Sequence, residues 1–170
     1  MKYGIVIIAL GYPLYGNCAF NLALSIKDKC PDIEIAIVYE PQTISKLSER
    51  ELGFFDYFVT LDEKHYTVGG KKQYQRSKLC LDIITNKLGW THTVYMDADN
   101  LWLDRPFDWL FGELVKRDFF IGYNGDYNPI THIKTSLNYT YWASKSEKEI
   151  CRYHGITKTL PQTVSGFVYF

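Results

Sequence analysis

Two nearly unbroken apolar runs close to the N-terminus limit what this chain can fold into. Residues 3–10 (YGIVIIAL) and 33–39 (IEIAIVY) are rich in isoleucine and valine and contain few polar positions. Runs of this kind are typical of strands buried on both faces, as in a parallel sheet that helices cover on each side. They therefore predict an α/β fold with a buried, mostly parallel sheet.

The segment between the two runs has the pattern of a helix. GYPLYGN (residues 11–17) is a loop by its glycine, proline and asparagine content, and Asn17 is the expected N-cap. Apolar side chains then repeat at helical spacing until Cys30-Pro31 ends the segment. The order strand, helix, strand indicates a βαβ unit.

The rest of the chain continues this alternation. We first expect a helix over 41–53 with a capping box from Ser48 to Glu51, a strand at 57–61 and a polar loop at 64–72. A helix over 73–88, stopped by Gly89, and a strand at 92–96 should follow. The last expected elements are a short strand at 101–103, a helical turn in 105–114, and strands at 118–123 and 165–170. Residues 124–163 are mixed and polar-aromatic. We expect one α/β domain over residues 1–170.

Charge and composition exclude some classes of partner. The chain has 19 Lys+Arg and 19 Asp+Glu residues, so it lacks the basic excess that nucleic acids or anionic membranes require. No apolar stretch approaches the roughly 20 residues of a membrane span. The first apolar run is short and is broken at residues 11–13, which favours a buried strand over a signal peptide. The cysteines form no CxxC pair, which favours reduced thiols in a cytoplasmic protein.

One pair of acidic residues follows an apolar strand directly. In TVYMDADNLWLD (residues 93–104), Asp97 and Asp99 end the strand and an apolar run resumes at once. Ligands of open α/β sheets bind outside the carboxyl ends of the strands. Two neighbouring carboxylates there repel each other unless a cation lies beside them, and Mg²⁺ and Mn²⁺ prefer oxygen ligands. The pair indicates a metal that clamps a diphosphate, although a solvated turn with an Asp cap is the simpler alternative.

Residues 76–111 (RSKLCLDIITNKLGWTHTVYMDADNLWLDRPFDWLF) resemble a known family, the GT-A glycosyltransferases, and within it the glycogenin-like and galactinol-synthase-like enzymes. The matching pieces are a helix that carries Lys78, the triplet Asp97-Ala98-Asp99 and the segment 107–111. The resemblance implies a Rossmann-like GT-A domain and a metal-dependent transferase that retains anomeric configuration. It implies a nucleotide-sugar donor, usually a UDP-sugar, and a carbohydrate or other hydroxyl acceptor.

The resemblance also implies roles for individual residues. Asp97 and Asp99 would bind Mn²⁺ (or Mg²⁺) and, with Ala98, the donor. Lys78 would bind the donor's sugar or phosphate, although a helix-surface pair with Asp82 is an open alternative. The other donor-binding residues that the resemblance implies are Ala9 and Leu10 through their backbone, Tyr15 as a stacking aromatic, and Ser165.

The sequence departs from the family pattern at several points. Tyr12-Pro13 stands where the family often has Asn-Asp, and Val164 replaces an asparagine that touches the donor sugar. His154 is a candidate for the family's third metal ligand, although a surface or core histidine is the simpler interpretation. The closing run SGFVYF suggests a fragment of a longer enzyme or an unusually short member.

Two other functions stay open at this point. A haloacid-dehalogenase-type phosphatase would use Asp97 as its nucleophile, because that class also places Asp-x-Asp after a strand. A degenerate, non-catalytic domain would bind a sugar nucleotide without turnover.

Overall fold

The structure is a computed structural model that describes residues 2–102, 112, 120–123 and 163–169. The chain divides into two compact units, Met1–Phe120 with Gly166–Phe170, and Ile121–Ser165. The smaller unit contains most of β7 (Phe120–Tyr123) and the first part of β8 (Thr163–Tyr169), both at positions predicted to be strands. The larger unit contains the other elements described below.

The larger unit is built on a mostly parallel sheet, as the sequence predicts. β1 (Tyr3–Ala9) lies between β2 (Glu34–Tyr39) and β6 (His92–Asp97) and is parallel to both, and β3 (Tyr57–Val59) pairs in parallel with β2. The last part of β8 is antiparallel to β6. The resulting order, β3-β2-β1-β6-β8, places β1 and β6 in the interior of the sheet.

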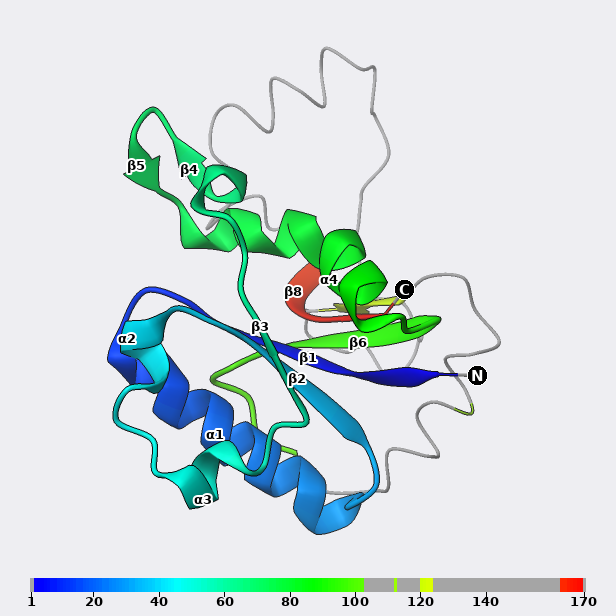
Figure 1. Ribbon diagram of the computed structural model, residues 1–170. Helices are drawn as coiled ribbons and strands as arrows, with labels where there is room; N and C mark the ends of the chain where they lie inside the picture. Colours follow the sequence, from blue (N-terminus) through cyan, green and yellow to red (C-terminus); the bar gives the residue numbers. More distant parts are fainter. Residues whose placement is uncertain (1, 103–111, 113–119, 124–162, 170) are drawn as a thin grey trace, which may run out of the picture. The chain divides into compact units, whose positions relative to one another are not determined.

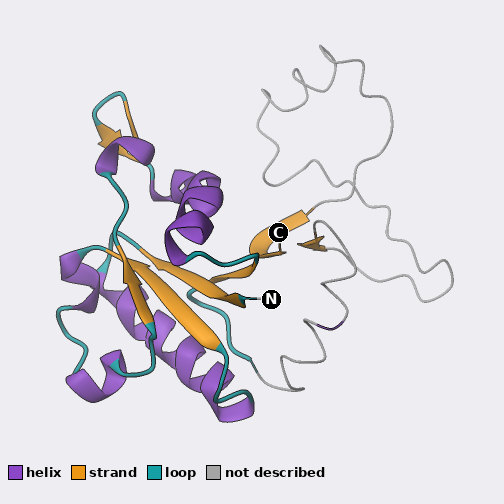
Figure 2. Ribbon diagram, turned by 45° about the vertical axis from the view of Figure 1, so that its right-hand side comes forward, coloured by secondary structure: helices purple, strands orange, loops and turns teal. Residues whose placement is uncertain are grey.

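Helices cover both faces of this sheet (Figure 1). On one face, apolar residues of α1 (Pro13–Lys29) pack with Ile5 and Ile7 of β1. On the other face, Val6 of β1 packs in a cluster with residues of α4 (Leu81–Leu88). Successive residues of a strand point to opposite faces, so the apolar run of β1 supplies both layers of core. Figure 2 shows the two helical layers on either side of the strands.

The start of α1 differs from the prediction. The helix begins at Pro13 after Tyr12, so Asn17 lies inside the helix rather than at its N-cap. Proline suits the first helical position because its fixed φ matches the helix and its missing N–H would have no partner there. Gly16 then lets α1 approach the backbone of α2 (Pro41–Ile44), since a Cβ at this position would lie 1.8 Å from the Thr43 carbonyl oxygen.

Two further segments are more divided than predicted. Residues 41–53 form α2 and α3 (Glu49–Leu52), and the predicted capping box is confirmed by the Ser48 and Glu51 contacts that begin α3. The expected loop over 64–72 contains the 3₁₀ helix η1 (Glu63–His65) and a hairpin of β4 (Thr67–Val68) and β5 (Lys71–Lys72). Gly69 and Gly70 form its turn with positive φ.

The helix predicted over 73–88 is the 3₁₀ helix η2 (Tyr74–Cys80) followed by α4, and Gly89 ends it in the left-handed conformation as predicted. Leu101 and Trp102 are not part of a strand, and the helical turn expected in 105–114 lies, apart from residue 112, outside the described residues. None of the helices seen in the described ranges has the length and apolar character that a bilayer crossing requires.

Candidate functional site

The parallel strands bring the predicted acidic residues to one edge of the sheet. Ile8 of β1 pairs with Asp97 of β6, so both strands end at the same level. Beyond β6 the chain turns, and the Asn100 N–H donates to the Asp97 carbonyl oxygen at 3.1 Å. The turn therefore holds the triplet of residues 97–99 at the carboxyl edge, where ligands of such sheets bind.

A hollow of about 280 Å³ lies at this edge. Its walls come from the end of β1, the start of α1, the helix η2 and the turn after β6. The predicted site residues that line it are Leu10, Tyr15, Lys78, Asp97, Ala98 and Asp99. Residues 8–15, 74–78 and 95–99, which are separate segments of the sequence, thus contribute to one concave site.

The Asp97 carboxylate is held by two donors. Lys78 Nζ lies 2.8 Å from Asp97 Oδ1 and 3.1 Å from Oδ2, and the Tyr95 hydroxyl also donates to Oδ1. Burial raises the pKa of the Tyr95 hydroxyl well above its usual range, and the charges of Asp97 and Asp99 raise it further. Tyr95 therefore stays protonated and fixes the orientation of the Asp97 carboxylate.

Ala98, the central residue of the triplet, packs into the core while the acidic residues on either side of it stay nearer the surface. Ala98 is buried in the core cluster beneath α1, whereas Asp99 is exposed and Asp97 is half-buried. A small apolar residue between the acids thus anchors the turn to the core. The two carboxylates remain at the rim of the hollow, where Asp99 is exposed and Asp97 is bound by Lys78 and Tyr95.

The loop after β1 forms another wall of the hollow. Leu10 is almost fully buried, and the Tyr15 side chain is 41% exposed. Ala9 is wholly buried in the core and does not line the hollow, so any role it has is through its backbone. Ser165 belongs to β8 in the smaller unit, and its side chain lies outside the described part of the structure.

The donor set of this edge fits a hard divalent cation. The described residues contain no group of three metal-ligating side chains, and His154 lies outside them. Mg²⁺-type ions are often held by one or two protein carboxylates and completed by water and substrate phosphates. Asp97 and Asp99 provide two such carboxylates, so the described residues suit an ion that a diphosphate helps to bind.

Several residues of the hollow were not predicted from the sequence. They are Ile8, Tyr74, Gln75, Ser77 and Tyr95. Tyr95 precedes Asp97 by two positions, and residues two apart share one face of a strand, so this neighbour could have been found. Ser77 lies three residues after Tyr74, the spacing at which side chains share a face in the 3₁₀ helix η2.

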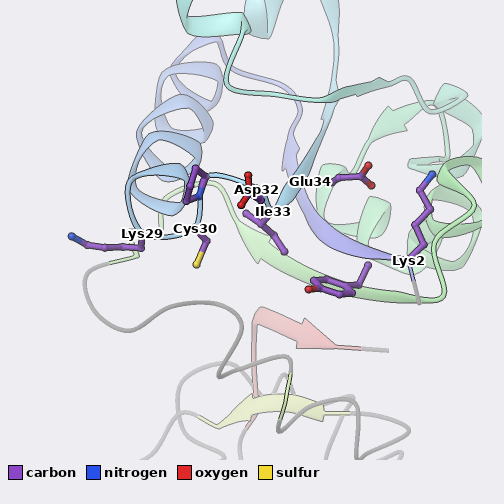
Figure 3. Close-up of a pocket in the computed structure, with 8 residues that line it drawn as sticks. Lys2, Lys29, Cys30, Asp32, Ile33 and Glu34 are labelled. Carbon is purple, nitrogen blue, oxygen red and sulfur yellow. The ribbon is translucent and has the colours of Figure 1, made fainter.

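A second hollow, of about 360 Å³, lies at the opposite, amino ends of β1 and β2. Figure 3 shows Lys2 and Glu34 on one side of it and Lys29 and Cys30 on the other. The Glu34 carboxylate accepts hydrogen bonds at 2.9 Å from the Tyr57 hydroxyl and from the Trp90 indole N–H. Glu34 thus stabilises the packing around the strands. The first hollow, at the carboxyl edge of the sheet, is the candidate site.

Comparisons with known proteins identify the fold. No protein-family model matches the chain, and no curated protein is significantly similar to it. Mouse xyloside xylosyltransferase 1 in its apo form is similar in structure over 100% of this chain and 67% of its own, with a TM-score of 0.60 and 14% identity.

Two structures of the galactosyltransferase LgtC are also similar. The complex with donor and acceptor sugar analogs gives a TM-score of 0.54 at 13% identity, and an active-site mutant gives 0.52 at 12%. The chain spans 57% and 56% of these two proteins. These neighbours are GT-A glycosyltransferases, so this chain has a GT-A fold. The glycogenin-like subgroup stays a prediction.

Proposed function

We propose that this protein is a metal-dependent glycosyltransferase that moves a sugar from a nucleoside-diphosphate sugar to an acceptor hydroxyl. The observation that carries the proposal is the hollow in which Asp97, Asp99 and Lys78 meet the loop after β1, at the carboxyl edge of a GT-A sheet. We expect a UDP-sugar as donor and a carbohydrate or other hydroxyl compound as acceptor. We also expect the transfer to retain the anomeric configuration of the sugar, and we expect the protein to be cytoplasmic.

The cation, Mn²⁺ or Mg²⁺, would be held by Asp99 and Asp97 together with phosphate oxygens of the donor. When bound, such an ion neutralises charge that develops on the departing diphosphate. Asp99 is exposed and is therefore the more accessible ligand. Asp97 is oriented by the Tyr95 hydroxyl, which fixes the direction in which its carboxylate faces the hollow.

Lys78 would add a second positive charge to the same diphosphate. Its ammonium now neutralises Asp97 and lies 5.3 Å from the centroid of the Tyr95 ring. Charge-assisted hydrogen bonds to phosphate oxygens are stronger than those between neutral groups. A donor diphosphate that enters the hollow would offer the Lys78 ammonium phosphate oxygens in place of Asp97, and the cation would then bind the carboxylate oxygens that the ammonium leaves.

The nucleoside would lie against the loop after β1. Tyr15 offers a partly exposed ring at the hollow, and base stacking on such rings does not require a particular base. The backbone of Ala9 and Leu10 would contact the base, and Ser165 would contact the donor sugar. These assignments come from the family resemblance and are part of the proposal.

The two alternative functions differ in how they use the same residues. A phosphatase nucleophile at Asp97 is disfavoured, because that class usually carries its Asp-x-Asp motif on the first strand, whereas Asp97 ends β6. A binding protein without turnover would use Asp97, Asp99 and Lys78 only to hold a sugar nucleotide in the hollow. Calorimetric binding of UDP without any sugar transfer or hydrolysis would select this second candidate.

A panel of nucleotide sugars, screened by thermal shift with and without Mn²⁺, tests the proposal. Ligands that bind the folded state raise the unfolding temperature. We expect a shift with at least one UDP-sugar that needs Mn²⁺ and is lost in Asp99→Asn. Asp28→Asn is the matched control, because it removes an exposed carboxylate from α1 outside the hollow. The absence of any shift across the panel would contradict the proposal.

A further inference from the structure

The carboxylate of Glu40 forms a buried hydrogen-bond centre beside the candidate site. Glu40 follows β2 and is 6% exposed. Its Oε2 accepts from the Gly11 N–H at 2.9 Å and from Gln42 Nε2 at 2.7 Å. Its Oε1 accepts from the Tyr66 hydroxyl at 3.0 Å and from Lys72 Nζ at 2.7 Å. Four donors thus converge on one carboxylate from separate parts of the chain.

One of these donors belongs to the loop that forms a wall of the hollow. Gly11 follows Leu10 and has φ +94°, a conformation that favours glycine. The ring of Tyr74 also lies close to Gly11, because its Cε2 would be 2.9 Å from a Cβ built on the glycine. The backbone at Gly11 therefore meets both the Glu40 carboxylate and the ring of Tyr74, which itself lines the hollow.

We propose that Glu40 is a positioning residue, which fixes the backbone of residues 10 and 11 and so shapes the nucleoside side of the hollow without touching the donor. The inference rests on the proposed function, since it concerns how a nucleoside diphosphate is bound. Glu40 itself does not line the hollow.

The buried charge has a positional role beside its effect on stability. A buried ion pair contributes little net stability, because desolvation of both charges offsets their attraction. Lys72 also has an exposed partner, Glu63, at 2.6 Å. A glutamine at position 40 has only one acceptor oxygen and would direct its NH₂ group at donors that need an acceptor. The single amide oxygen could therefore not accept a hydrogen bond from the Gly11 N–H and also accept from the Tyr66 hydroxyl and Lys72.

The experiment compares Glu40→Gln with Glu63→Gln in the full chain. Both variants remove one carboxylate bound to Lys72, but only Glu40 reaches the loop. We expect Glu40→Gln to weaken UDP binding in Mn²⁺ by about tenfold, the loss typical of an unsatisfied buried partner. Glu63→Gln should bind UDP as the wild type does. Calorimetry measures both affinities.

A second readout needs no ligand. Hydrogen exchange at the Gly11 amide should become faster in Glu40→Gln and stay unchanged in Glu63→Gln. Unchanged Gly11 exchange, or wild-type UDP affinity in Glu40→Gln, would overturn the inference and leave the proposed function intact. A wild-type protein that binds no UDP refutes the proposed function, and this inference falls with it.

A milder variant covers the case in which Glu40→Gln does not fold. Tyr66→Phe removes one donor from Oε1 and keeps the pair of Glu40 with Lys72. We expect it to weaken UDP binding by about two- to fivefold through a looser carboxylate. Affinity equal to that of the wild type would overturn the positioning role.

Discussion

Replacement of Lys78 by methionine should change metal affinity and nucleotide affinity in opposite directions. In the structure Lys78 Nζ lies 2.8 Å from Asp97 Oδ1, and the two side chains are 26% and 33% exposed. Without nucleotide, the ammonium competes with a cation for Asp97. With nucleotide, the same ammonium is expected to bind the diphosphate. Methionine preserves much of the length of the side chain and removes the ammonium, with its charge and its hydrogen-bond donors.

The size of the first effect follows from the geometry of the pair. Two unit charges at this separation attract by about 1.5 kcal/mol in bulk water. Ion pairs that are open to solvent retain about 0.2–1 kcal/mol, because ordering of the side chains and screening reduce the attraction. Mn²⁺ alone should therefore bind Lys78→Met about 1.4- to 5-fold more tightly than the wild type.

The second effect is larger and opposite. A hydrogen bond to a charged group contributes about 1.5–3 kcal/mol, so UDP in saturating Mn²⁺ should bind the variant about tenfold more weakly or worse. Calorimetry measures both affinities, with Arg76→Met as the control for loss of a positive charge from η2. Arg76 does not line the hollow. A change of the same sign for Mn²⁺ and UDP would refute this account of Lys78.

Other contacts give further measurable expectations. Gly16→Ala places a Cβ 1.8 Å from a carbonyl oxygen of α2 and should lower the free energy of unfolding by about 2–3 kcal/mol in chemical denaturation. Gly53→Ala, which meets its nearest atom at 3.3 Å, should cost clearly less, and equal losses would contradict the packing argument. Tyr15→Ala should weaken UDP binding about fivefold or more, whereas Tyr12→Ala, outside the hollow, should not; equal effects in calorimetry would exclude stacking on Tyr15. Burial acts to raise the pKa of Glu40, but its hydrogen bonds outweigh burial and hold the pKa below the usual 4.5. Its stabilising contribution is therefore complete above that value and is lost as the pH falls through the folded-state pKa. The difference in thermal midpoint between the wild type and Glu40→Gln should shrink from pH 7 to pH 3, and a constant difference would contradict the shift.

The sheet could be predicted because local sequence determines it. The runs that form β1 and β2 are continuous and apolar, and this pattern alone indicates strands covered on both faces. The predicted start of α1 was wrong. The loop-like residues 11–17 include Pro13, and proline begins a helix as readily as it ends one. Its true start also depends on Gly16, whose close contact with α2 is a tertiary feature that the local pattern does not contain.

The candidate site could be predicted only in part for a related reason. Asp97 and Asp99 stand next to a strand in the sequence, so their position at the sheet edge follows from the pattern. The pairing of Lys78 with Asp97 joins residues 19 positions apart, and no periodicity reports it. The role of Glu40 is even harder to predict from the sequence. The hydrogen-bond donors to its carboxylate come from separate segments, which meet only in the folded structure.

The central claim is that Asp97 and Asp99 form a cation site completed by a nucleoside diphosphate. Calorimetric titration of UDP into the wild type and Asp99→Asn, with and without Mn²⁺, tests it most directly. The account predicts that Mn²⁺ strengthens UDP binding to the wild type by about tenfold or more, as coupling between two ligands at one site allows. It also predicts that Asp99→Asn removes this dependence. UDP binding that is indifferent to Mn²⁺ in the wild type, or equally dependent on it in Asp99→Asn, would contradict the claim.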